Sequence, residues 1–236
     1  MLPGLPNFRD LGGIPCAEGT IRTGLVFRAP ALAPLTPADI AALERLDPVA
    51  IIDLRAPDEA RGAPPAALAA RRVAVPVVPG AAPRLRSAIL KGGLTEAVAT
   101  GLMVETYADF VRAHAGAFAE LLRLVAAAEG PVVFHCTAGK DRTGFAAALL
   151  LSACGAGWEA VRADYMRTAG LWSPDPGLAA LVPDAARAAL FGVDPAYLES
   201  AFSALAAAHG TAAEFARAAL GGDAALDGLR RRLVAA

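Results

Sequence analysis

One segment near the middle of the chain constrains the fold more than any other. Residues 131–134 form a short apolar run, typical of a buried strand, and lead directly into a glycine-containing stretch, residues 135–144. Residues 145–153 are mostly apolar and predict a helix. This order places the loop at the carboxyl end of a strand and at a helix N-terminus. Backbone N–H groups and the helix dipole at such a position favour an anion.

Strands and helices alternate over the first half of the chain. Residues 49–54 are a continuous apolar run that ends in a charged residue, which predicts a central strand covered on both faces. Residues 73–78 predict a second strand, and Pro76 indicates an edge or an irregular end. Thr36 and Pro37 indicate a helix start, as N-cap and first helical residue. Short apolar pieces before them predict a small unit of strands and turns.

Helices dominate the second half. Residues 79–93 are rich in Pro, Gly and Arg and predict a loop, whereas residues 94–128 predict helix with a break near Gly116. Further helices are predicted over residues 157–166, 177–190, 195–209, 211–220 and 224–234. We therefore predict an α/β fold with a mainly parallel central sheet flanked by helices. We expect a single domain over residues 1–236, with residues 167–236 as a helical extension.

Composition excludes several classes of function. Lys and Arg total 22 against 23 Asp and Glu, and this balance gives no support to nucleic-acid binding. The three cysteines are widely spaced and form no C-x-x-C pair, which argues against a disulfide framework and a zinc site, so no metal is predicted. The first residues do not resemble a signal peptide, and the longest uncharged stretch is too short to span a bilayer. We expect a cytoplasmic protein, although export without a signal peptide stays open.

The loop itself carries chemistry. A helix N-terminus and nearby cations favour the thiolate form of a cysteine, so we predict that Cys136 is a nucleophile towards phosphorus. The planar guanidinium of Arg142 can hold two phosphate oxygens. A cysteine that only fills the core does not need this surrounding sequence, whereas Cys16 and Cys154 are expected to be packing residues. A Walker-type nucleotide loop is excluded because no glycine lies five residues before Gly139.

These residues carry a resemblance to a known family. Residues 135–144 match the protein tyrosine phosphatase signature H-C-x-x-x-x-x-R-[ST]-G, and most resemble bacterial tyrosine/lipid phosphatases with H-C-x-x-G-K-D-R-T-G. Weaker matches follow in order at residues 7–13, 27–28, 52–55, 164–165 and 229–230. The resemblance implies a dual-specificity-like phosphatase fold and a phosphocysteine intermediate, with no metal or organic cofactor. The implied substrates are phosphorylated proteins or phosphoinositides, and inorganic phosphate is the product.

The resemblance also suggests a general acid inside the loop, Asp141, whose alternative role is to orient the loop. Asp53, at the end of a central strand, is a second candidate or a buried partner of Arg55. Asp109 is a third, but it lies in a helical stretch and is expected to face solvent. His135 is expected to orient the loop. The remaining predicted phosphate-binding positions are Thr137, Ala138, Gly139, Lys140 and Thr143.

Several interpretations stay open. The Lys140 side chain either adds charge for a polyanionic head group, which favours a phosphoinositide phosphatase, or is a solvated cation. An inactive phosphoresidue-binding module is disfavoured because Cys136 and Arg142 are intact. A thiol-based arsenate reductase needs further reactive cysteines. Asn7, Arg9 and Asp10 form a possible support under the loop. Residues 171–191, broken by prolines, form either a mobile lid over the site or ordinary helical packing.

Overall fold

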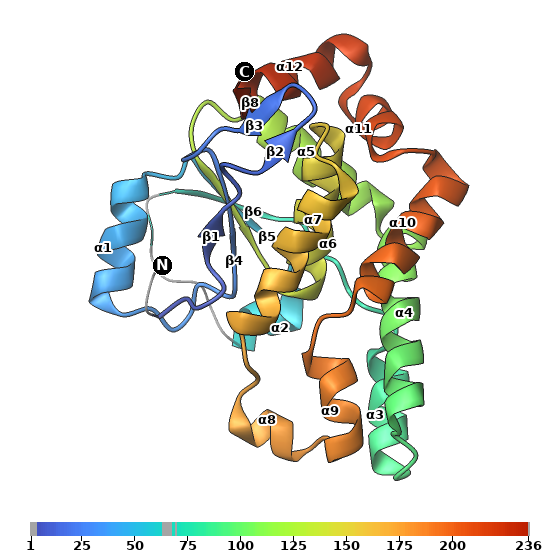
Figure 1. Cartoon of the computed structure of the whole chain (residues 1–236). Coiled ribbons are helices and arrows are strands. Elements are labelled where there is room, and N and C mark those ends of the chain that lie inside the picture. The colour runs from blue at the N-terminus through green and yellow to red at the C-terminus, as the bar shows by residue number, and fades with distance from the viewer. Residues whose placement is uncertain (1–3, 63–67, 69, 236) are drawn as a thin grey trace.

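A five-stranded sheet lies at the centre of the molecule, in the order β1-β4-β7-β5-β6 (Figure 1). The computed structural model describes residues 4–62, 68 and 70–235. The strands are β1 (Arg9–Asp10), β4 (Val26–Ala29), β5 (Ala50–Asp53), β6 (Arg71–Ala74) and β7 (Val132–His135). Strands β4, β7, β5 and β6 are parallel, and β1 pairs antiparallel with β4. The predicted α/β fold with a mainly parallel sheet is confirmed.

The remaining elements surround this sheet. The helices are α1 (Pro37–Leu46), α2 (Pro57–Gly62), α3 (Ala82–Leu90), α4 (Glu96–Arg112), α5 (Ala115–Ala127), α6 (Asp141–Ala153), α7 (Trp158–Met166), the 3₁₀ turn η1 (Arg167–Gly170), α8 (Pro176–Ala180), α9 (Asp184–Phe191), α10 (Pro195–His209), α11 (Ala212–Leu220) and α12 (Asp223–Leu233). A second, three-stranded sheet joins β2 (Pro15–Cys16), β3 (Gly19–Ile21) and β8 (Val234–Ala235). The end of the chain thus returns to its beginning. Within the described residues, no helix is both long and apolar enough to cross a bilayer.

Both faces of the central sheet are buried, because consecutive strand residues point to opposite sides. Ile51 and Val133 belong to the core on the α1 side, which also contains Leu43. Their neighbours Ile52 and Phe134 belong to the larger core on the other side. This explains why the central strands are continuous apolar runs rather than alternating ones.

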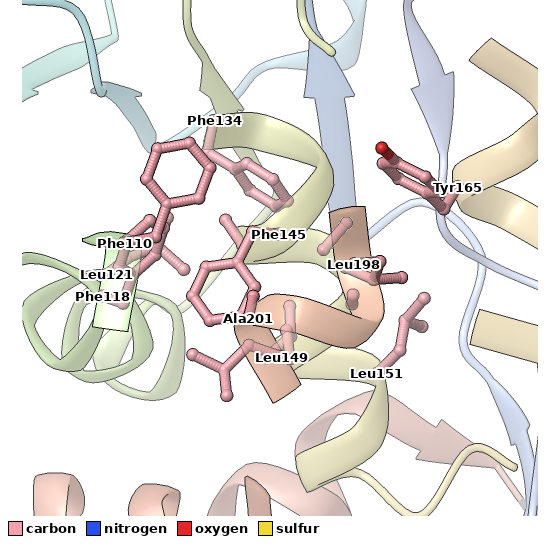
Figure 2. Close-up of a cluster of buried hydrophobic side chains, with 14 of the residues drawn as sticks. Phe110, Phe118, Leu121, Phe134, Phe145, Leu149, Leu151, Tyr165, Leu198 and Ala201 are labelled. Carbon is pink, nitrogen blue, oxygen red and sulfur yellow. The ribbon is translucent and has the colours of Figure 1, made fainter. Parts of the chain in front are cut away.

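The larger core is built around α6. Phe145 of this helix lies 4.7 Å, ring centroid to centroid, from Phe118 of α5, and stacks near Phe110 of α4. Figure 2 shows these rings between Phe134 of the sheet and the helices that cover α6. Because α6 is buried along almost its whole length, the position of its N-terminus, where the loop after β7 ends, is fixed by packing.

Four expectations about the elements are settled. Thr36 is the N-cap of α1, and its side chain and that of Asp39 form a capping box. The predicted loop over residues 79–93 is wrong, because it contains α3, with a proline in its first turn. The predicted helix 177–190 is divided at Pro183 into α8 and α9. The break predicted near Gly116 is confirmed and lies at residues 113–114, between α4 and α5. The first residues of the chain, on which the expectation about export depends, lie outside the described part.

Candidate active site

The ends of three parallel strands bring the predicted residues to one edge of the sheet. Ala29, His135 and Asp53 are register partners across β4, β7 and β5. The loop leaves β7 after His135, and α6 begins at Asp141 with Lys140 as its N-cap. Residues 136–140 therefore lie where a strand end meets a helix N-terminus, the place that the sequence predicted.

The carbonyl groups of this loop are turned outward. The amide of Ala31 donates to the carbonyl of Thr137 over 2.9 Å. Asn7 Nδ2 donates to the carbonyls of Ala138 (3.2 Å) and Gly139 (2.9 Å). In each trans peptide the N–H points opposite to the C=O. The N–H groups that follow these carbonyls therefore face the other side of the loop, where a nest of donors favours an anion.

A buried polar network holds the loop from below. Arg28 Nη2 donates to the carbonyl of Gly139 (2.9 Å), and Arg28 Nη1 is 2.6 Å from Asp164 Oδ2. Arg9 Nε is 2.7 Å from the other oxygen of Asp164, and Arg9 Nη1 also donates to Asn7 Oδ1. Burial opposes ionisation of Asp164, but the two arginines still hold the pKa of its carboxyl below the ordinary value. Asn7 and Arg9 thus support the loop.

Asp10 has a different role. Its carboxylate accepts from the amides of Gly12 (2.8 Å) and Gly24 (2.7 Å), which fixes the turns next to β1. Gly139 is required for a steric reason: its φ is +65°, and a Cβ there would lie 2.6 Å from the carbonyl oxygen of Ala29. Any other residue would be strained and would push the loop away from β4.

Cys136 is nearly buried, with 2% of its surface exposed. Arg142 is held by Glu59 of α2: Arg142 Nη1 is 2.6 Å from Glu59 Oε2 and Nη2 is 2.7 Å from Oε1. Burial by itself lowers the pKa of Arg142, but the bonds with Glu59 and the nearby Cys136 raise it above the ordinary value. The guanidinium is therefore charged and fixed beside the thiol.

Glu59 was not predicted from the sequence. Its carboxylate also accepts from Thr137 Oγ1 (2.6 Å) and from the amide of Ala56 (2.8 Å), so it joins α2 to the loop. Burial opposes its ionisation, yet the bonds from Arg142 and Thr137 lower the pKa of Glu59 to about 2. The available signal was an acidic residue in the first turn of a helix that follows a central strand.

Asp141 lies at the end of a chain of hydroxyl groups. Tyr107 Oη, from α4, donates to Asp141 Oδ1 over 2.9 Å, and Tyr165 Oη is 2.9 Å from Tyr107 Oη. Burial, and then the charge of Asp141, raise the pKa of Tyr107 well above its ordinary value, so the phenol keeps its proton and acts as a donor. Sequence reasoning missed Tyr107, because a helical tyrosine carries no local sign of its partner.

The ammonium of Lys140 lies between Asp141 and the end of α9. Its Nζ donates to the carbonyls of Leu190 (2.7 Å) and Gly192 (2.9 Å) at the end of α9, and it also lies 3.3 Å from Asp141 Oδ1 and 5.8 Å from the centre of the Trp172 ring. It is not a solvated cation, since its side chain is buried. The physical reason is the negative end of the α9 dipole, which attracts a cation. Only the backbone N–H of Lys140 remains a candidate phosphate donor.

The other predicted residues support rather than line the site. His135 Nδ1 lies 3.2 Å from the carbonyl of Cys136, and burial lowers the pKa of this imidazole. Asp53 is bound by Arg55 (Nη2 to Oδ2, 2.7 Å), as the partner interpretation expected. Thr143 Oγ1 is buried and has no hydrogen-bond partner within the described residues. Asp109 lies in α4, two residues after Tyr107, and is partly exposed.

A cavity adjoins Asp141 and Arg142. Its volume is about 350 Å³, and its walls are apolar residues of α3, α4, α8 and α9. Helices α8 and α9 belong to the segment 171–191, so this segment does lie beside the site. Whether it opens and closes as a lid stays a prediction.

The chain is similar in sequence to known phosphatases. A sequence profile described as the Tyrosine phosphatase family matches residues 1–235. A protein of Cupriavidus necator that carries the name of a tyrosine-protein phosphatase is 38% identical over 70% of this chain, which spans 60% of that relative's length. Triple specificity protein phosphatase PtpB of Mycobacterium tuberculosis is 32% identical over 71% of this chain and 68% of its own. Among solved structures, P. aeruginosa TpbA has a TM-score of 0.42 and 19% identity, covering 91% of this chain and 89% of its own.

Proposed function

Because this chain belongs to the tyrosine phosphatase family, we propose that it hydrolyses phosphotyrosine and related phosphomonoesters through a phosphocysteine intermediate on Cys136. The observation that supports this most is the loop of residues 136–141, whose carbonyls are bonded outward while Arg142 is fixed beside the thiol. This arrangement provides a nucleophile and a ring of donors around one point, as transfer of a phosphoryl group requires.

In the first step the Cys136 thiolate attacks phosphorus while the P–O bond to the leaving group breaks. The loop N–H groups and Arg142 stabilise the charge on the three equatorial oxygens. Asp141, in its protonated form, donates its proton to the leaving oxygen. The products are the free alcohol or phenol and a phosphorylated Cys136.

In the second step water attacks the same phosphorus atom. Asp141, now a carboxylate, accepts a proton from that water, and the S–P bond breaks. Phosphate leaves, and the thiolate is restored. Tyr107 keeps Asp141 Oδ1 in one position in both steps, which is the role of a positioning residue.

Substrate range is the finer part of the proposal. The printed name of PtpB describes triple specificity for that protein, and we propose a broad range here, with phosphoinositides as the alternative substrates. The Lys140 charge gives phosphoinositides less support than its place in the loop suggested, because that ammonium is bound by carbonyls at the end of α9 and by Asp141. We further propose a cytoplasmic protein of one domain. The support is that its cysteines are unpaired and that α10 and α11 pack on α4, α5 and α6.

A phosphate-release panel tests the proposal. Purified protein is given phosphotyrosine, phosphoserine and phosphothreonine peptides and soluble phosphoinositide head groups, with the Cys136→Ala variant as the control for contaminating activity. The proposal predicts Cys136-dependent release with phosphotyrosine peptides preferred. Release from head groups alone would favour the alternative, and release that survives in the variant would contradict a cysteine mechanism.

A further inference from the structure

The cavity beside Asp141 and Arg142 has features that hydrolysis of a phosphate group does not explain. At about 350 Å³ it falls within the usual size of small-molecule sites. In Figure 1, α3, α8 and α9 lie together at one end of the molecule, next to α4. Their aliphatic side chains form the walls, among them Leu85, Ile89, Leu102, Met103, Leu178 and Leu181.

Few polar residues line this cavity. Three of the described lining residues are polar, and they are Thr106, Asp141 and Arg142. The hydroxyl of Thr106 donates its proton to the carbonyl of Leu102 in its own helix over 2.7 Å, so it has no proton left for an anionic ligand. The groups left to contact a ligand are the proposed acid and the proposed phosphate clamp. A molecule that fits is therefore anionic where it meets Arg142 and apolar beyond it.

The rim of the cavity is apolar as well. Leu178 of α8 and Leu181, the C-cap residue of that helix, line the cavity, yet their surfaces are 49% and 67% exposed. Large exposed leucines around a hollow are typical of a ligand site rather than of a surface that faces only water. Lys140 ties the neighbouring end of α9 to the loop, so the wall of the cavity is attached directly to the catalytic residues.

We propose that this cavity binds an aliphatic chain, and that phosphomonoesters of unbranched alkyl alcohols are substrates. The phosphate is at the loop and the chain lies between α3, α4, α8 and α9. This inference rests on the proposed function. A peptide is a poorer occupant, because its backbone N–H and C=O groups would be buried against walls that offer no partners. An alkyl chain has no such groups and gains free energy for every methylene removed from water.

The reaction is the same two-step hydrolysis. Cys136 takes the phosphoryl group, Asp141 gives its proton to the alkoxide oxygen, and water then releases phosphate. The net change is one alkyl phosphate and one water converted to one alcohol and one phosphate. An aliphatic alkoxide is a poorer leaving group than a nitrophenolate, so alkyl phosphates depend more strongly on the acid. Asp141→Asn is expected to slow octyl phosphate more than p-nitrophenyl phosphate.

The test is a series of alkyl phosphates from ethyl to decyl, each below the concentration at which it forms micelles. The value of kcat/KM, from released phosphate, is expected to rise about fourfold for each added methylene, from roughly 0.8 kcal/mol per methylene, and then to level off when the cavity is full. A value that does not change with chain length overturns the inference.

Two variants locate the effect. The double variant Leu178→Asn/Leu181→Asn is expected to reduce the ratio of octyl to ethyl phosphate activity by tenfold or more. Leu90→Asn is the matched control, because Leu90 of α3 is 77% exposed and does not line the cavity. An equal fall of the ratio in both variants would overturn the assignment to this cavity. Release from phosphotyrosine but not from alkyl phosphates would overturn the inference alone, whereas no release from any phosphomonoester would overturn the proposed function too.

Discussion

Cys136 and Cys154 lie at the two ends of the same helix. Cys136 precedes the N-terminus of α6 by a short loop, and Cys154 is its C-cap. Both are buried, with 2% and 4% of their surfaces exposed. Burial alone therefore does not distinguish a nucleophile from a packing residue.

The electrostatic surroundings of the two thiols differ, because they lie at opposite ends of the α6 dipole. At the N-terminal end, loop N–H groups and the charged Arg142 favour an anion. At the C-terminal end the helix presents carbonyls, one of which, from Ala153, accepts from Arg230 Nε over 3.0 Å. There, burial raises the pKa of Cys154 to about 12. One helix thus favours an anion at one end and a neutral thiol at the other.

Replacing each of the two cysteines in a separate variant is expected to give the largest difference in activity. Cys136→Ser should reduce turnover of p-nitrophenyl phosphate by at least about 10³-fold, because a serine hydroxyl remains protonated. Cys154→Ala should keep most of the activity, since that thiol is at the wrong end of α6. Initial rates, with circular dichroism to verify folding, measure both. Comparable losses of activity in the two variants would contradict the distinction between Cys136 as a nucleophile and Cys154 as a packing residue.

The clamp at the N-terminal end is the next target. Arg142→Lys is expected to cost about 10²–10³-fold in kcat, close to the cost of Arg142→Ala, because lysine keeps the charge but not the planar fork. Kinetics with p-nitrophenyl phosphate, and inhibition by vanadate, report on this. A lysine variant with a near-native rate would show that charge alone is enough.

Glu59→Gln should have a smaller effect, with opposite consequences for kcat and for phosphate binding. We expect kcat to fall about tenfold as Arg142 loses its fixed position, while phosphate binds more tightly because a nearby negative charge is gone. A rise in kcat would mean that Glu59 is a competitor of substrate rather than a positioning residue.

The same variant has a pH signature. The pKa of Glu59 is depressed from 4.5 to about 2, so its contribution to stability is present above pH 4.5 and is lost as the pH falls towards 2. Between those values the wild type should lose more resistance to urea than Glu59→Gln. Equal losses would show that Glu59 does not carry this stability.

The smallest effect concerns access to Cys136. Lys140→Met removes the bonds to the end of α9 and the ion pair with Asp141, and it should speed peroxide inactivation by a few fold if residues 171–191 shield the thiol. Peptide mapping should find new oxidation at Cys136 and none at Cys154. An unchanged rate in the folded variant would mean that the segment is ordinary packing.

The sequence predicts well where local chemistry decides the structure. The apolar runs at β5 and β7 and the cap at Thr36 depend on neighbours in the chain, and they are confirmed. The α3 region was taken for a loop because Pro and Gly usually interrupt structure, whereas a proline in the first turn favours a helix.

The surroundings of the site were harder to predict. Glu59 and Tyr107 act on residues 83 and 34 positions away, and their partners follow only from how α2 and α4 pack. Lys140 shows the opposite error: its place in the loop was predicted, but its long side chain reaches the end of α9, 50 residues on. Residue types locate the candidate active-site loop, and tertiary packing decides which groups support it.

The central claim is that Cys136 carries the phosphoryl group. The most direct measurement is acid quenching of the enzyme during turnover of p-nitrophenyl phosphate, followed by intact mass and peptide mapping. The experiment includes Asp141→Asn, which should slow hydrolysis of the intermediate. We predict that the mass of one phosphoryl group is found on Cys136, and none on Cys154 or Cys16. Turnover without any phosphoenzyme, or a phosphoryl group on another residue, would contradict the account.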